Sequence, residues 1–130
     1  MVKQMFDVEG YWKVIVYYNV DYNFFDEIIW EMKMSDFPER IIKNVWTTMK
    51  KGDAKAATVN NQEKHISLVL FNPHASKADY INSIVHEAEH VKQAMLKTYM
   101  VEDAGEPSAY TIGYIVMRMY EVFKKILSNP

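Results

Sequence analysis

Apolar and polar positions along the chain follow two different periods, and the change of period predicts where strands and helices lie. Residues 11–20 are dense in β-branched and aromatic side chains, which predicts a strand in the middle of a sheet. Residues 65–71 (HISLVLF) predict a second strand, and residues 54–60 form a weaker strand candidate. Residues 60–63 between these two segments are typical of a turn, so we expect a hairpin.

Four other segments have helical periodicity. The first begins near Phe24, with Asp21, Asn23 or Asp26 available as a cap, and the second opens at Pro38 and ends at Lys50-Lys51-Gly52. The third spans about residues 76–100, after a Ser76–Asp79 spacing that resembles a capping box. The last runs to about residue 127. Its predicted buried stripe is Ala109, Ile112, Gly113, Val116, Met119, Tyr120, Phe123 and Leu127.

These elements predict an α+β or α/β fold, with a small sheet of about three strands covered by helices. The last two helices are expected to pack against each other, because both have an apolar stripe, and Gly113 would allow a close approach. At 130 residues the chain has the length of one domain, spanning 1–130.

Composition limits the kinds of binding partner and metal ligand that the chain can have. The net charge is −2 and no basic cluster exceeds two residues, so nucleic-acid binding is not expected. The chain has no cysteine, so a metal would need His, Asp or Glu ligands. No apolar run approaches the roughly 20 residues that cross a bilayer, and Lys3, Asp7 and Glu9 stand where a signal peptide needs its apolar core. We therefore expect a cytoplasmic protein without a membrane span.

The most specific pattern is His86-Glu87-Ala88-Glu89-His90 in the third helical segment. Residues four apart lie on one helix face, so His86 and His90 can offer two imidazoles to one metal ion. Glu87 stands beside them, where a carboxylate can act as general base and later as proton donor. The spacing therefore predicts a zinc-dependent hydrolase site.

The helical wheel supports this interpretation. The histidines share a polar side with Asp79, Asn82, Gln93 and Lys97, opposite an apolar stripe of Ile81, Ile84, Ala88, Val91 and Met95. Extending the predicted stripe of the last helix one turn back reaches Glu106. A carboxylate aligned with a buried face must be paired or bind a cation, because burying it bare is costly.

His86-Glu87-Ala88-Glu89-His90, followed sixteen residues later by Glu106-Pro107-Ser108-Ala109-Tyr110, resembles the gluzincin side of the zincin metallopeptidases. More closely, the chain is similar to the small single-domain zincin peptidases of bacteria and their phages. The resemblance implies a zincin-like fold, zinc ligation by His86, His90 and Glu106, and a catalytic acid/base role for Glu87. It also implies a peptide or protein substrate lying along an edge strand that ends near Phe71.

Several alternatives stay open. Tyr110, which stands where larger gluzincins commonly have an aspartate, could donate to a developing oxyanion, and His74 could reach the site from its loop. Glu102 and Asp103 are rival third ligands, and His65 is expected on the strand surface. The protein could also be a catalytically silent zincin-like module that binds metal, or a helical interaction domain with a chance pentad. The sequence does not fix the oligomeric state.

Overall fold

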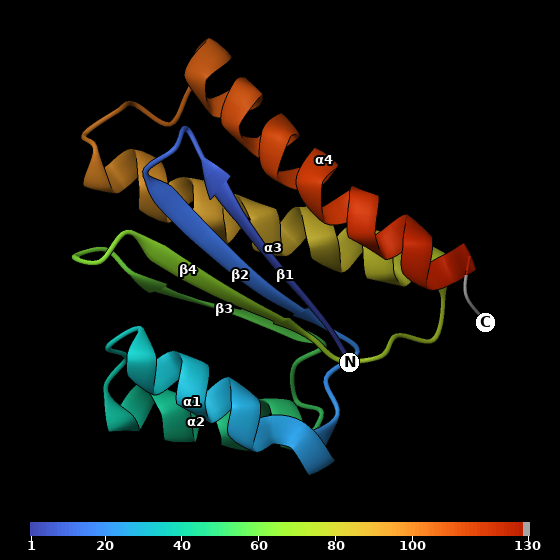
Figure 1. Ribbon diagram of the computed structural model, residues 1–130. Coiled ribbons are helices and arrows are strands. Elements are labelled where there is room, and N and C mark those ends of the chain that lie inside the picture. The colour runs from blue at the N-terminus through green and yellow to red at the C-terminus, as the bar shows by residue number, and fades with distance from the viewer. Residues whose placement is uncertain (129–130) are drawn as a thin grey trace.

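A computed structural model describes residues 1–128 as a four-stranded mixed sheet with helices on both faces (Figure 1). The strands are β1 (Val2–Val8), β2 (Trp12–Tyr18), β3 (Ala56–Asn61) and β4 (Ile66–Phe71). The helices are a short 3-10 turn, η1 (Tyr22–Phe24), followed by α1 (Phe25–Met34), α2 (Glu39–Lys50), α3 (Lys77–Thr98) and α4 (Gly105–Ser128). The α+β class is thus confirmed, and the expectation of about three strands is one strand short.

The sheet order is β1-β2-β4-β3, with β2 and β4 parallel and both outer strands antiparallel to their neighbours. The central position predicted for the 11–20 strand is confirmed, as is the β3–β4 hairpin. The strand that the sequence did not reveal is β1. Its inward positions include Gln4, which lowers the apolar signal, but the Gln4 amide is satisfied because it donates to the Arg118 carbonyl and accepts from the Tyr18 hydroxyl.

A tight turn joins β1 to β2, so two strands that follow each other in the chain also pair with each other in the sheet. Glu9 and Gly10 both have positive φ, at 56° and 77°, which is the backbone pattern of a tight hairpin turn. Glycine adopts this conformation without a steric penalty. The register then places Val8 opposite Trp12.

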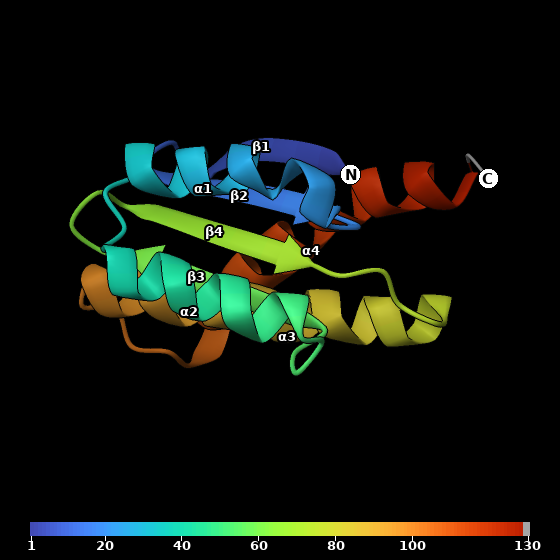
Figure 2. The ribbon, with the colours of Figure 1, turned by 90° about the horizontal axis from the view of Figure 1, so that it is seen from below.

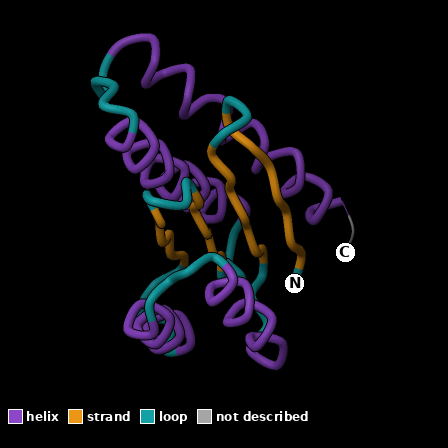
Figure 3. The backbone as a smooth tube through the Cα atoms, turned by 60° about the vertical axis from the view of Figure 1, so that its left-hand side comes forward, coloured by secondary structure: helices purple, strands orange, loops and turns teal. Residues whose placement is uncertain are grey.

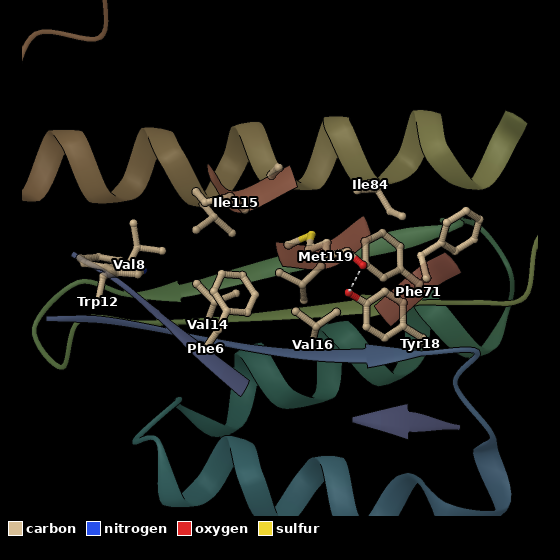
Figure 4. Packing of buried hydrophobic residues seen from close by; sticks show 14 of the residues in the cluster. Phe6, Val8, Trp12, Val14, Val16, Tyr18, Phe71, Ile84, Ile115 and Met119 are labelled. Carbon is tan, nitrogen blue, oxygen red and sulfur yellow. Dashed lines mark hydrogen bonds between the residues drawn. The ribbon is translucent and has the colours of Figure 1, made fainter. Parts of the chain in front are cut away.

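Each face of the sheet has its own core. Side chains of alternate strand residues, including Phe6, Val14 and Val16, pack against α3 and α4 (Figure 4). The intervening residues, including Ile15 and Leu68, pack against α1 and α2 on the opposite face. Figures 2 and 3 show the resulting three layers, with α1 and α2 on one side of the strands and α3 and α4 on the other.

On the α3/α4 face, the two helices divide the sheet between them. α3 contacts β3 and β4, while α4 contacts β1 and packs along α3, as predicted for the last two helices. The edge at β3 is therefore next to α3, and the edge at β1 is next to α4. Within residues 1–128, no helix combines the length and apolar character needed to cross a membrane.

Candidate metal centre

The helix α3 exposes the two histidines of the pentad to solvent and buries Glu87 and Ala88. Its start is capped by Ser76, whose Oγ accepts from the Asp79 N–H at 3.1 Å, so half of the predicted capping box is confirmed. The residues Ile84, Ala88, Val91 and Met95 are buried against the sheet, as the periodicity predicted. His86 and His90 lie outside that stripe and are exposed.

The two imidazoles converge. Nε2 of His86 and Nε2 of His90 lie 3.2 Å apart, a separation that also suits an N–H···N hydrogen bond between the rings. With Zn–N bonds of about 2.0–2.1 Å, two nitrogens of a tetrahedral zinc site are separated by about 3.3 Å. The histidine pair therefore fits a zinc ion in both chemistry and spacing.

Glu87 completes the group of potential ligands. One ligand atom from each of His86, Glu87 and His90 lies within 4.8 Å of the others. Glu87 is only 5% exposed, whereas both histidines are exposed, so Glu87 is the buried member of the group. Its Oε2 lies 3.9 Å from His86 Nε2.

The other carboxylate oxygen of Glu87 is fixed by the sheet. Thr58 on β3 donates from Oγ1 to Glu87 Oε1 at 3.0 Å. A hydrogen bond to a charged acceptor is stronger than one between neutral groups, so Thr58 restrains the carboxylate. Sequence analysis missed Thr58. Its only signal was a polar residue inside the weak strand candidate at 54–60.

These contacts place the group at a sheet edge. β3 pairs with β4 on one side, and within residues 1–128 no strand pairs with its other side. The strand that ends at Phe71, β4, lies between β2 and β3, so the expectation that it forms the edge is wrong. From Ser67 to Phe71, β4 is buried on both faces because it is central, and the free edge lies one strand further out, at β3.

Glu106 lies outside the group of three. It is exposed in the first turn of α4, so the expectation that it continues a buried face is wrong. The buried face of α4 consists of Thr111, Ile115, Met119 and Phe123. Two members of the predicted stripe, Met119 and Phe123, are confirmed as buried, but Ala109, Gly113, Tyr120 and Leu127 are exposed. Apolar residues occur on several sides of α4, which made the register ambiguous.

The packing of α4 explains the position of Glu106. Lys92 on α3 donates to Ser108 on α4 at 2.9 Å, so α4 begins beside the Lys92 side of α3. Two residues along an α-helix correspond to a rotation of about 200°, so Lys92 lies about 160° around the axis from His90. The structure thus brings His86, Glu87 and His90 together and leaves Glu106 on another side of α3.

The rival ligand Asp103 already has partners. Lys92 Nζ lies 2.9 Å from Asp103 Oδ1 and 2.8 Å from Glu89 Oε1, and Ser108 also donates to Asp103 at 2.7 Å. The hydrogen bonds from Lys92 and Ser108 lower the pKa of Asp103. Burial alone would lower the pKa of Lys92, but its hydrogen bonds to Asp103 and Glu89 outweigh burial and raise it. The second rival, Glu102, is exposed.

His74 is held by protein groups on both ring nitrogens. Nδ1 lies 2.6 Å from the Asn72 carbonyl, which can only accept, so Nδ1 is the protonated nitrogen. Nε2 shares a 2.8 Å hydrogen bond with the Ser83 hydroxyl, and the ring stacks on Tyr80. His74 therefore joins the loop after β4 to α3, and it is not in the group with His86.

The remaining candidates lie elsewhere. Tyr110 is 64% exposed and lines a small hollow with Glu9 and Gly10 of the β1–β2 turn, near the β1 edge of the sheet. His65 is not on a strand surface as expected. It precedes β4 with a φ of 56°, stacks on Trp12 and shares a 2.9 Å hydrogen bond with the Tyr99 hydroxyl.

Comparison with known proteins finds no matching family model, no matching curated protein and no matching solved structure. The geometry of the group at the β3 edge is therefore the basis for inferring a function.

Proposed function

We propose that this protein is a zinc-dependent metallopeptidase of zincin type. The observation that supports this proposal best is the 3.2 Å separation of the His86 and His90 Nε2 atoms, with the buried Glu87 carboxylate beside them. A chance pentad on an ordinary helix would not need a carboxylate that is buried under the histidine pair and held by the sheet.

The residues divide the chemistry between them. Zinc bound by the histidines would polarise a water molecule and lower its pKa toward neutrality. Glu87 accepts the proton of the attacking water through the carboxylate oxygen that Thr58 does not hold, and returns it to the leaving amine. Thr58 keeps the carboxylate oriented toward the His86 side during both transfers.

The free edge of β3 supports a peptide as the substrate. Unpaired N–H and C=O groups of an edge strand can pair with an extended peptide, which would lie beside the histidine pair. Side chains of such an added strand alternate between the two sheet faces. One face is that of α3, and on the other a groove of about 740 Å³ lies between α2 and the β3–β4 hairpin. Its lining includes Pro38, Arg40, Ile41, Val59 and Lys64.

A tetrahedral catalytic zinc site has three protein ligands and one open position. In this proposal Glu106 remains the predicted third ligand, as the resemblance to gluzincins implies. Its exposed position on the first turn of α4 means that the α3–α4 connection must rearrange for Glu106 to reach the ion. Glu106→Gln should then weaken zinc binding, while Glu102→Gln should not.

A second function has its own supporting observation. Glu87 lies in the same group as the two histidines, so it could itself be the third ligand. In that case no carboxylate at this site would be left to act as base. The protein would then be a silent zincin-like module that binds metal without hydrolysis.

Glu87→Gln distinguishes the two functions. If Glu87 is the base, the variant should retain about one equivalent of zinc and lose roughly two to four orders of magnitude in turnover. If Glu87 is a ligand, the variant should lose zinc as well. Zinc is measured by elemental analysis of protein purified without a histidine tag, and hydrolysis by mass spectrometry of a mixed peptide library. Wild-type protein that binds no zinc, or equal cleavage by wild type and Glu87→Gln, would contradict the peptidase proposal.

A further inference from the structure

The outward face of α4 is apolar in its middle and charged at its ends. Tyr110, Met117 and Tyr120 are 64%, 50% and 41% exposed, and Gly113 lies between them on the same side. The acidic Glu106 precedes these residues and the basic Lys124 follows them, both exposed. We call the six residues Glu106, Tyr110, Gly113, Met117, Tyr120 and Lys124 the α4 seam.

The α4 seam lies opposite the buried face of the helix. At about 100° per residue, the six positions fall within roughly 80° of one another around the axis. The buried residues Thr111, Ile115, Met119 and Phe123 centre on the other side. Figure 1 shows α4 at the outer border of the molecule, and by helical periodicity the seam is on the side of α4 opposite its buried face. Within residues 1–128, Tyr120 has one ring contact, with Phe123, and Tyr110 borders the β1–β2 turn, but all three apolar side chains of the seam remain at least 41% exposed.

The residues of the seam match the residues of a second seam that runs in the opposite direction. If a second copy of α4 lies antiparallel, with the two-fold axis at the level of Ile115, the position numbers of facing residues add to 230. Glu106 then faces Lys124, Tyr110 faces Tyr120, and Gly113 faces Met117. Each pair occurs twice, and the pairs are an opposite-charge pair, an aromatic pair and a small residue against a large one.

Gly113 provides the room for this approach. A Cβ at this position would have no neighbour within 4 Å, so Gly113 faces open space rather than α3, contrary to the close approach expected from the sequence. Beside a second helix, the missing side chain would leave a recess for Met117 of the partner copy. Methionine fills such recesses well because its chain is unbranched and flexible.

We propose that the α4 seam is a self-association surface on which two copies of this chain pair through antiparallel α4 helices. The occupant is a second copy, because the charge order and the large-to-small order both match the seam's own reversed sequence. The seam spans about 27 Å of helix. A single helix pair is small for an interface, so the dimer should be weak, with a dissociation constant in the micromolar range.

Sedimentation equilibrium over low to high micromolar concentrations tests the proposal. The wild-type weight-average mass should rise toward twice the mass of the chain in the presence of a chelator, which keeps Glu106 in the seam and away from a metal ion. Met117→Glu should remain monomeric. Met34→Glu is the matched control, since Met34 on α1, across the sheet, is also an exposed methionine, at 64% against 50% for Met117. A monomeric wild type, or equal effects of the two variants, would overturn the proposal and leave the seam to another partner.

Disulfide trapping tests the antiparallel order, because the natural chain has no cysteine. Gly113→Cys and Met117→Cys proteins are mixed and oxidised, and the products are separated by mass. Antiparallel pairing should give mainly the mixed disulfide between the two variants, since position 113 faces position 117. Mainly homodimers of each variant would indicate parallel helices and would overturn the proposed order. Both variants are at exposed positions, and circular dichroism verifies their folds.

Discussion

Two polar clusters lie on α3 within seven residues of each other, and they differ in how completely their atoms are paired. Lys92 has a side chain that is 7% exposed and contacts Glu89, Asp103 and Ser108. His86 has a side chain that is 68% exposed, and among residues 1–128 its Nε2 lies near His90 and Glu87. The first cluster joins α3 to the start of α4. The second leaves nitrogen lone pairs available for a ligand.

The difference shows how a structural polar cluster and a binding cluster are built on one helix. A buried ammonium group must have its hydrogen bonds satisfied within the protein, because leaving it unpaired is costly. Exposed imidazoles are satisfied by water, so they can exchange water for a metal ion at little cost to the fold. We therefore expect changes at Lys92 to affect stability and changes at His86 or His90 to affect metal binding.

The largest expected effect is on zinc binding by the histidine cluster. His86→Ala or His90→Ala should weaken zinc binding by on the order of a hundredfold or more, because one of few strong ligands is lost. In the absence of metal, either variant should change the free energy of unfolding by less than about 0.5 kcal/mol, as for other exposed positions. Competition with a coloured chelator measures the affinity. Unchanged zinc affinity in both variants would remove the metal centre from consideration.

The next effect is on stability at Lys92. Lys92→Met keeps the length of the side chain but removes three hydrogen-bonding interactions, and should lower the free energy of unfolding by about 1–2 kcal/mol. The loss is limited because Glu89 and Asp103 are partly exposed and can be solvated again. Urea denaturation measures it. Zinc affinity should remain at the wild-type value, and a loss of zinc binding would show that the two clusters are coupled.

The contrast also explains what the sequence could predict. The spacing of His86 and His90 and their place outside the apolar stripe depend only on helical geometry, so both were predictable. The buried face of α4 was not, because apolar side chains such as Tyr110 and Met117 also lie on its outer side. Periodicity cannot decide between two apolar faces of one helix, and Glu106 was consequently placed on the wrong one.

Contacts between distant segments were beyond sequence reasoning for a different reason. Thr58 meets Glu87 only because β3 is the outer strand of the sheet and α3 packs beside it. That outcome depends on strand order, which local patterns do not determine. The first strand was missed because a polar residue, Gln4, stands at one of its inward positions. The hydrogen bonds that make this position tolerable come from Tyr18 and Arg118, which are distant in the sequence.

A smaller effect, on kcat/KM, is expected at Thr58, which contacts Glu87 beside the histidine pair. Thr58→Val removes the hydroxyl that donates to Glu87 Oε1 while keeping the shape of the side chain. A freer carboxylate should lower kcat/KM about tenfold, which corresponds to about 1.4 kcal/mol of transition-state stabilisation. Zinc content should be unchanged. Thr58→Ser retains the hydroxyl and should recover most of the activity, and a Ser variant as impaired as Val would indicate a packing role instead.

The smallest effect is the pH dependence of the Lys92 cluster. The hydrogen bonds from Lys92 and Ser108 hold the pKa of Asp103 below its usual value in the folded state. A carboxylate with a lowered folded-state pKa stabilises the fold above its unfolded pKa, about 3.9, and loses that contribution as the pH falls through the folded pKa. Wild type should therefore be slightly more stable than Asp103→Asn at neutral pH. The difference should begin to shrink below about pH 4 and vanish only when the pH is below the folded-state pKa of Asp103.

Urea denaturation of both proteins from neutral to acidic pH measures this convergence. Glu102→Gln is the matched control, because Glu102 precedes Asp103 in the same turn but makes no ion pair or hydrogen bond in the described chain. Its stability difference from wild type should stay small and constant over the same pH range. If Asp103→Asn instead showed no decrease in its offset from wild type as the pH falls from neutral to well below about 4, the contribution of Asp103 would come from packing or from the neutral side chain. The Lys92 cluster would then stabilise the α3–α4 connection without an electrostatic contribution from this carboxylate.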